Sequence, residues 1–393
     1  PEVAAAMMPY FTEKFGNASS IHYFGQEARG AVDTARHQVA DLINARPNEI
    51  VFTSGGTEAN NLAIRGLIEA RVSSPHVSKG LEGAQNTRLH IITSSIEHSA
   101  VINVCEDLEK QGYEVTYLPV YEDGIVRTED VLAAITDETV LISIMTANNE
   151  IGTLQPVAEI GRLVRSLRES GKKIWFHTDA VQAAGKIPLD VEAIGCDLLS
   201  ISAHKIYAPK GVGALYIRRG VRLHPQNIGG HQERERRGGT ESVPSIVAFG
   251  KACEIARNQL EVSAATLRKL RDQFESQVGE VITDITFNGH RINSLPSISN
   301  ISFSSIEGEA LLINLDMQGV AVSTGSACSS GSLEPSPVIR ALGSNEDRAR
   351  GAVRFSFGRF NSGKDLEQLL KVLPVAVHKL RELSPARSKH QAQ

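Results

Sequence analysis

The sequence predicts an α/β protein with a mostly parallel sheet. From residue 31 onward, short apolar and β-branched runs alternate with segments of helical periodicity, an alternation typical of βαβ units. Polar residues stand near the end of each run, where ligands of such sheets collect. The expected strands are residues 50–53, 89–93, 114–118, 140–146, 174–178 and 198–202.

Local signals predict the helices between and after these strands. Residues 1–15 have a helical pattern, and residues 31–45 carry an apolar stripe that ends at Arg46-Pro47-Asn48. A glycine turn opens a helix from about residue 56, and another helix is expected over 99–111. After about residue 245 the pattern changes to one long amphipathic helix, roughly 243–278, and a shorter α+β segment.

The length of 393 residues is too great for one typical core and favours two packed domains. We expect a large domain over residues 12–250 and a smaller α+β domain from residues 1–11 and 251–383. Residues 384–393 form a polar tail with no apolar period, and residues 71–88 are expected to be a surface loop.

Composition excludes several functions. The 41 Lys and Arg against 45 Asp and Glu give a net charge of -4. The protein therefore lacks the excess of positive charge that binding to the phosphates of nucleic acid requires. No apolar run reaches the length of about 18 residues that a membrane helix needs. The first residues lack the basic start of a signal peptide. Four cysteines without a CxxC pair predict neither a disulfide framework nor a zinc site. We therefore expect a cytoplasmic protein with no metal.

Lys205 directly follows an apolar strand, and Asp179 stands at the end of another. A lysine amine next to a second cation, or removed from water, has a lowered pKa and can form a Schiff base with an aldehyde such as pyridoxal 5'-phosphate. A buried carboxylate would keep the ring nitrogen of that cofactor protonated. Alternatively, Lys205 is a surface lysine and Asp179 caps a helix.

Three further features support a phosphate-bearing cofactor. Gly56 and Thr57 open a helix, whose first N–H groups and hydroxyl can bind phosphate. Ser202 and His204 lie just before Lys205 in the sequence and could add donors. His98 lies at a strand-to-helix turn, where its imidazole could stack on a planar ring, move protons, or simply cap the helix.

Cys328 lies in Ser323-Thr324-Gly325-Ser326-Ala327-Cys328-Ser329-Ser330-Gly331-Ser332, a run of small residues too polar for a core strand. This composition predicts a mobile loop with an accessible thiol that can act as a thiolate nucleophile, or a thiol exposed by chance. Cys105, Cys196 and Cys253 are predicted to be structural, because apolar residues or predicted core elements surround them.

Six ordered motifs together closely resemble the NifS/IscS-type cysteine desulfurases, over nearly the whole chain. The motifs are Ser-Gly-Gly-Thr-Glu-Ala-Asn-Asn (54–61), Glu-His-Ser-Ala-Val (97–101), Ala-Asn-Asn-Glu-Ile-Gly (147–152), His-Thr-Asp-Ala-Val-Gln (177–182), Ser-Ala-His-Lys (202–205) and Gly-Ser-Ala-Cys-Ser-Ser-Gly (325–331). The resemblance implies the aspartate-aminotransferase-like fold of class V aminotransferases, pyridoxal 5'-phosphate as cofactor and a homodimer.

The resemblance also implies a role for each site residue. Lys205 would hold the cofactor and move protons at the substrate Cα, while His98 would stack on the ring and serve as acid and base. The other implied cofactor contacts are Gly56, Thr57, Asn149, Asp179 at the pyridine nitrogen, Gln182 at the phenolic oxygen, Ser202, His204, and Thr240 from the second subunit. Asn149 and Arg354 would hold the substrate carboxylate.

By the same resemblance, L-cysteine becomes L-alanine and its sulfur stays on Cys328 as a persulfide. Gly-Ser-Ala-Cys-Ser-Ser-Gly matches the long-loop group of the family. A separate acceptor protein would take the sulfur for iron–sulfur cluster assembly or tRNA thiolation.

The sequence departs from the family pattern at three places. It begins at Pro1, without the segment like Tyr-Leu-Asp-Asn-Ala-Thr-Thr that normally comes first, so we expect a shortened chain with weakened turnover. Ala208 and His231 stand where glycine is usual.

The sequence leaves three alternatives to a cysteine desulfurase. They are a selenocysteine lyase, a pyridoxal-phosphate aminotransferase in which Cys328 is incidental, and a catalytically silent scaffold that binds sulfur-transfer partners.

Overall fold

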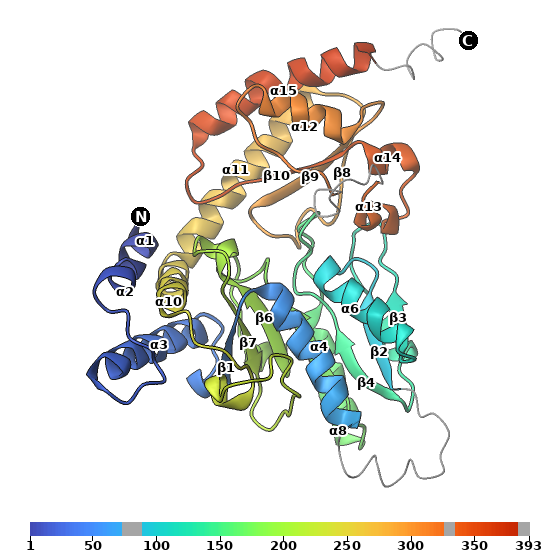
Figure 1. Cartoon of the computed structure of the whole chain (residues 1–393). Coiled ribbons are helices and arrows are strands. Elements are labelled where there is room, and N and C mark those ends of the chain that lie inside the picture. Colours follow the sequence, from blue (N-terminus) through green and yellow to red (C-terminus); the bar gives the residue numbers. More distant parts are fainter. Residues whose placement is uncertain (73–88, 326–334, 384–393) are drawn as a thin grey trace. The chain divides into compact units, whose positions relative to one another are not determined.

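The computed structural model describes residues 1–72, 89–325 and 335–383, which form two compact units (Figure 1). The first unit contains Pro1–Leu118, Arg127–Thr146 and Pro156–Leu260. The second contains Pro119–Val126, Ala147–Gln155 and the chain from Glu261 onward. Within the described ranges, no helix is long and apolar enough to cross a membrane.

A sheet of seven strands is the centre of the first unit, as far as its residues are described. The strands are β1 (Ile50–Thr53), β2 (His90–Ser94), β3 (Glu114–Leu118), β4 (Thr139–Ser143), β5 (Trp175–Asp179), β6 (Leu198–Ser202) and β7 (Gly213–Ile217). Their order is β1-β7-β6-β5-β4-β2-β3. From β3 to β6 all neighbours are parallel, whereas β7 is antiparallel to both β6 and β1. The predicted mostly parallel sheet is therefore confirmed.

Helices cover this sheet and bury its apolar strands. They are α1 (Glu2–Met7), α2 (Pro9–Thr12), α3 (Tyr23–Leu42), α4 (Gly56–Val72), α6 (Ser99–Lys110), α7 (Thr128–Ala133), α8 (Val157–Glu169), α9 (Val191–Ile194) and α10 (Val243–Asn258), with 3₁₀ helices η1 (Pro47–Glu49), η2 (Ala203–Ile206) and η3 (Gln232–Glu235). Residues of α4 and α6, including Ile64, Leu67 and Val101, form a buried cluster with β2 and β4. Such burial of apolar area is the main force that stabilises the layer.

The second unit has its own core around an antiparallel sheet. Its elements are α11 (Leu260–Val281), β8 (Ile285–Phe287), β9 (Ile298–Phe303), α12 (Gly308–Asp316), α13 (Pro337–Ala341), α14 (Glu346–Arg350), β10 (Ala352–Ser356) and α15 (Gly363–Leu383). The strand order is β10-β9-β8. Phe274 of α11 is completely buried, and its ring centroid lies 4.8 Å from that of Phe355. Both phenylalanines belong to one apolar cluster with residues of α12 and α15.

The structure differs from the expected organisation at several boundaries. The single helix expected over 243–278 is divided at Gln259, where the backbone leaves the helical conformation between α10 and α11. Residues 1–11, expected in the smaller domain, lie in the first unit because α1 packs against α10 and buries Val3. Residues 147–155, expected in the large domain, belong to the second unit.

Parallel pairing places several predicted residues at one edge of the large sheet. The chain leaves the carboxyl ends of β2, β5 and β6 at His98, Asp179 and Lys205, respectively. Because parallel strands end at the same edge, these side chains belong to one region of the first unit.

His177 of β5 is expected to make the stability of the first unit sensitive to acid. Its ring nitrogens lie 2.8 Å from Ser143 Oγ and 3.0 Å from Ser200 Oγ, and burial lowers its pKa from 6.5 to about 3. Between these values the unfolded chain binds a proton that the folded chain does not. Stability is therefore expected to fall as the pH falls below 6.5, by up to about 1.4 kcal/mol per pH unit.

A His177→Gln variant cannot be protonated at this position and should lack that part of the slope. Urea unfolding between about pH 7.5 and about pH 5 measures the difference between the two proteins, in which all other histidines are shared. Parallel pH profiles for wild type and variant would contradict the assignment.

Candidate functional site

Asp179 is the buried acid of the site at the carboxyl edge of the sheet. Its Oδ2 accepts a hydrogen bond from Asn60 Nδ2 at 2.7 Å, and its Oδ1 accepts one from Val181 N at 2.9 Å. Burial raises its pKa, whereas both hydrogen bonds and the charges of His98 and Lys205 lower it. Asp179 therefore caps the turn that follows β5, and its carboxyl group is within electrostatic reach of His98 and Lys205.

His98 begins α6 and is fixed by that position. As the N-cap residue it accepts the N–H of Ala100 at Nδ1, at 3.1 Å. Burial lowers its pKa; Asp179 opposes this effect and Lys205 adds to it. The ring is therefore neutral at pH 7, and because Nδ1 is an acceptor, the ring proton is on Nε2. The capping interpretation and the proposed contact with a cofactor are compatible, because capping leaves Nε2 for another partner.

Lys205 lies in η2, directly after β6, and Tyr207 ends this turn with a left-handed backbone at φ 68°. The side chain is exposed in the single chain and interacts electrostatically with Asp179 and His98. The structure thus brings together the lysine, the acid and the histidine that the sequence singled out. The three residues end or follow three different strands, and the pairing of these strands in one sheet makes them neighbours.

The start of α4 lies close to the residue that ends β6. Helical bonding begins with Ala59 N to Gly55 O at 3.0 Å, so the N–H groups of the first turn have no partner within the helix. A Cβ on Gly56 would lie 2.9 Å from a methyl carbon of Val181 and 3.5 Å from Ser202 Cβ, so glycine allows this close approach. An anion at this helix start would meet backbone donors.

Side chains around this helix start add further polar groups. Ser202 Oγ and His204 Nδ1 lie 2.9 Å apart, and burial, followed by the charges of Lys205 and Lys210, lowers the pKa of His204. Thr57 is exposed on the first turn of α4. These contacts place Ser202 and His204 together, beside the helix whose start was predicted to bind phosphate.

Gln182 and Thr240 have different surroundings. The Oε1 of Gln182 accepts a hydrogen bond from Lys186 at 2.8 Å, which leaves its amide N–H groups as donors. Thr240 is exposed, on a segment tied to the first turn of α4 by Arg237 Nε and Glu58 Oε1 at 2.9 Å.

Asn149 and Arg354 belong to the second unit. Arg354 Nη1 donates to the carbonyl oxygen of Asn149 at 2.6 Å. Its Nε is buried without a hydrogen-bond partner among the described residues. The predicted pair is therefore in direct contact, with the guanidinium bound to the backbone of Asn149. The remaining predicted catalytic residue, Cys328, lies outside the described residues.

Sequence reasoning missed two side chains of this edge. Asn60 holds Asp179 from one turn into α4. Glu97 is buried, and its Oε1 accepts hydrogen bonds from Ser94 Oγ at 2.6 Å and from Met145 N at 2.9 Å. Burial, together with the nearby Asp179 charge, raises the pKa of Glu97 to about 8, so the carboxyl is protonated at pH 7. Asn60 lies in the motif 54–61 and Glu97 in the motif 97–101, and this placement is the sequence signal that points to each.

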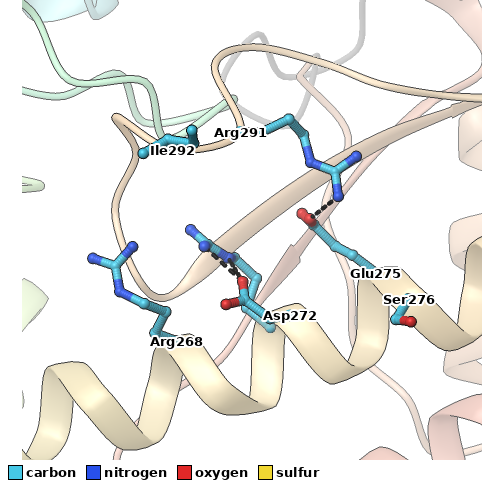
Figure 2. A pocket seen from close by; sticks show the side chains of 7 residues that line it. Arg268, Asp272, Glu275, Ser276, Arg291 and Ile292 are labelled. Atoms are coloured by element: carbon cyan, nitrogen blue, oxygen red, sulfur yellow. Dashed lines mark hydrogen bonds and ion pairs between the residues drawn. The ribbon is translucent and has the colours of Figure 1, made fainter.

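A pocket in the second unit is separate from the predicted site residues (Figure 2). It has a volume of about 390 Å³ and is lined by residues of α11 and of the chain before β9, among them Arg268 and Arg271. Arg271 pairs with Asp272 at 2.7 Å, and Arg291 pairs with Glu275 at 2.9 Å. Since most of its charges are paired and none of the predicted site residues lines it, we do not assign the reaction to this pocket.

Comparison with known proteins defines the class. Residues 1–369 match the family described as aminotransferase class-V, and the chain belongs to this family. It is 49% identical to the cysteine desulfurase IscS of Dictyoglomus turgidum over 384 residues, which are 98% of this chain and 93% of that protein. It is 48% identical to the cysteine desulfurase IscS of Methanosarcina thermophila, over 98% of this chain and 90% of that one.

Solved structures agree with this assignment. A NifS-like protein superposes with a TM-score of 0.87 at 35% identity, covering 96% of each chain. SspA in complex with cysteine superposes with a TM-score of 0.77 at 36% identity, covering 92% of this chain and 96% of that one. The fold is aspartate-aminotransferase-like, and within the class V aminotransferases this chain is one of the cysteine desulfurases.

Proposed function

We propose that this chain uses pyridoxal 5'-phosphate to convert L-cysteine to L-alanine and keeps the sulfur as a persulfide on Cys328. The observation that carries the proposal is the meeting of Lys205, Asp179 and His98 at the carboxyl edge of the parallel strands. A buried carboxylate, a lysine amine and a neutral imidazole are the groups that this cofactor chemistry requires.

The donors and acceptors of this edge fit the cofactor. The buried Asp179 would face the pyridine nitrogen, which is cationic when protonated, and Gln182 can donate to the phenolic oxygen because its Oε1 is occupied by Lys186. The phosphate would bind the first N–H groups of α4 at Gly56 and Thr57, with Ser202 and His204 beside it. Lys205 would hold the aldehyde carbon.

When bound, the cofactor draws electrons from the substrate Cα and makes its hydrogen acidic. Lys205 Nζ would take this proton and return it. His98 Nε2, the free ring nitrogen, would move a second proton near the substrate. Arg354 and Asn149 would hold the substrate carboxylate, since the guanidinium offers parallel donors to two oxygens.

Sulfur transfer requires one thiolate and no external oxidant. The Cys328 Sγ would attack the substrate sulfur, so that an S–S bond forms while the substrate Cβ–S bond breaks. The electron pair of that bond goes to carbon, which takes a proton and becomes the methyl group of alanine. The sulfur is oxidised as the carbon is reduced, and Cys328 keeps a persulfide.

Incubation with added pyridoxal 5'-phosphate, L-cysteine and a reductant tests the proposal. We expect the absorption of the bound cofactor to change on addition of L-cysteine, and alanine and sulfide to appear in equal amounts. Alanine without sulfide, or turnover that requires a 2-oxo acid, would contradict it. The reductant releases the persulfide in place of the acceptor protein, for which iron–sulfur cluster assembly or tRNA thiolation is the proposed use.

A homodimer is part of this proposal, and the N-terminal region supports it. Several large apolar side chains there are exposed in the single chain, including Phe15 at 76%, Ile21 at 93% and Tyr23 at 75%. Clustered exposed apolar groups mark interaction sites. In a dimer, the exposed Thr240 would reach the phosphate of the neighbouring subunit. The reduced thiols Cys105, Cys196 and Cys253 suit the cytoplasm that we propose as its compartment.

We expect sedimentation to give the mass of two chains, and the double variant Ile21→Glu, Tyr23→Glu to shift the population toward one chain, because buried charges weaken an apolar interface. Val375→Glu, at an exposed apolar position of α15, is the matched control and should stay dimeric. A wild-type protein that sediments as a single chain would refute the proposed assembly.

A further inference from the structure

We propose that Glu150 is a positioning residue for the sulfur-transfer step, because its carboxyl group lies against Gly325 and Ser336, which stand just before and just after the segment 326–334. That segment contains Cys328, so the inference rests on the proposed function. Glu150 follows Asn149 in the motif 147–152, and it is a buried acid with no role in the proposed proton transfers or in substrate binding.

Ser336 connects the second end of the segment to Glu150. Its Oγ donates to Glu150 Oε2 at 2.6 Å and accepts the N–H of Ile339 at 3.2 Å, which caps α13. Ser336 is only 3% exposed and Glu150 only 8%. A short hydrogen bond between a hydroxyl and a buried carboxyl group fixes both side chains. Glu150 therefore holds the chain at Ser336, the second residue after the segment.

Gly325 places the first end of the segment against the same carboxyl group. A Cβ at Gly325 would lie 2.3 Å from Glu150 Oε2 and 2.4 Å from Ser336 Cβ, so only glycine allows this approach. Two residues earlier, the backbone of Ser323 pairs with that of Arg354 through hydrogen bonds of 2.7 Å and 3.1 Å. Both ends of the segment are thus attached within the second unit.

The backbone of Glu150 is itself held firmly. Asn148 Oδ1 accepts the N–H groups of Glu150 and Ile151 at 2.8 Å and 3.0 Å, and Asn300 Nδ2 donates to the carbonyl oxygen of Glu150 at 3.2 Å. All partners in these three bonds are buried. A rigidly held carboxyl group can define the position of its partners, whereas a mobile one cannot.

The same acid faces the predicted substrate-binding arginine. Burial raises the pKa of Glu150, and the hydrogen bond from Ser336 and the charge of Arg354 oppose this shift. Arg354 also donates to the carbonyl oxygen of Asn149, the residue before Glu150. Through the carbonyl oxygen of Asn149, the backbone beside Glu150 is therefore connected to the arginine proposed to hold the substrate carboxylate. In the transfer step, the Cys328 Sγ must reach the substrate sulfur in line with the breaking Cβ–S bond, and fixed positions of Gly325 and Ser336 relative to the arginine would favour this alignment.

Two variants of Glu150 separate the effect of its hydrogen bond from the effect of its charge. Glu150→Asp keeps the charge but withdraws the oxygen by roughly 1.5 Å, one carbon–carbon bond, beyond hydrogen-bond distance of Ser336. Glu150→Gln keeps the length and an accepting oxygen but loses the charge. Ser336→Ala removes the donor. Glu367→Asp, at an exposed position of α15, is the matched control.

In the loaded enzyme, we expect Glu150→Asp and Ser336→Ala to lower kcat for alanine about tenfold or more, with KM for L-cysteine within about twofold of the control. Glu150→Gln should keep kcat within about threefold of the control, because Ser336 still finds its acceptor. A purely structural role would instead change kcat and KM together with the melting temperature.

Alkylation by iodoacetamide in the cofactor-free protein gives a readout independent of turnover. Mass spectrometry of the Cys328 peptide should show a rate changed by about fivefold or more in Glu150→Asp and Ser336→Ala, and unchanged in Glu150→Gln. The buried Cys105 and Cys253 report general unfolding and should remain unlabelled.

The inference is overturned if Glu150→Asp and Ser336→Ala both match the control in kcat and in alkylation of Cys328, or if Glu150→Gln is as impaired as Glu150→Asp. If Glu150→Asp does not fold, Ser336→Ala against the control decides. A wild-type chain that makes no alanine would refute the proposed function, and the alkylation rates would still decide whether Glu150 positions the segment.

Discussion

Replacing Lys205 by alanine is expected to abolish covalent retention of pyridoxal 5'-phosphate and to lower alanine formation from L-cysteine by about 10³-fold or more. Lys205 is the amine that η2 places within electrostatic reach of Asp179 and His98. Its loss removes both the group that holds the cofactor and the group that moves the Cα proton. Borohydride reduction followed by mass spectrometry measures retention, and alanine release measures turnover.

Lys173→Ala is the control for this experiment. Lys173 is an exposed lysine of the same unit that precedes β5, at the amino end of the strand whose carboxyl end carries Asp179. The control should retain the cofactor and its turnover. If Lys205→Ala behaves like Lys173→Ala, Lys205 is not the cofactor lysine.

The Cys328→Ser variant is expected to lose about 10²-fold or more of its alanine formation, while the change in cofactor absorption on adding L-cysteine persists. A hydroxyl is a far weaker nucleophile toward sulfur than a thiolate. The substitution at residue 328 nevertheless leaves the residues of the proposed cofactor site unchanged. The measurement pairs a spectrum with alanine release. A variant that keeps wild-type turnover would show that Cys328 does not receive the sulfur.

The three described cysteines are controls for the reactivity of Cys328, because they are buried. Burial raises the pKa of Cys105 to about 12, and it raises the pKa values of Cys196 and Cys253 as well. At neutral pH these three side chains are thiols rather than thiolates and cannot attack sulfur efficiently. Cys105→Ala should therefore leave the turnover rate unchanged per folded molecule.

Much of the fold could be predicted because its strands are short apolar runs with clear ends. The strands β1, β3 and β6 coincide with the predicted ranges 50–53, 114–118 and 198–202. Parallel pairing then brings the residues after the strands together, which made the predictions of Asp179, His98 and Lys205 possible. Helix boundaries were less certain, since the local pattern is continuous through Gln259, where the structure divides α10 from α11.

What the sequence could not provide are contacts between residues far apart in the chain. Asn60 and Asp179, separated by 119 positions, meet only because α4 packs against the sheet. Glu150 and Ser336 are 186 positions apart, and neither has a local pattern that points to the other. The division into units was also hidden, because residues 147–155 join the second unit through contacts with residues such as Leu295 and Asn300.

The most direct test of the central claim is the mass of the Cys328 peptide after the loaded enzyme has reacted once with L-cysteine without reductant. The account predicts a peptide heavier by one sulfur atom and one alanine released for each modified chain. Alanine release with an unmodified Cys328 peptide, or added sulfur that persists in the Lys205→Ala variant, would contradict it.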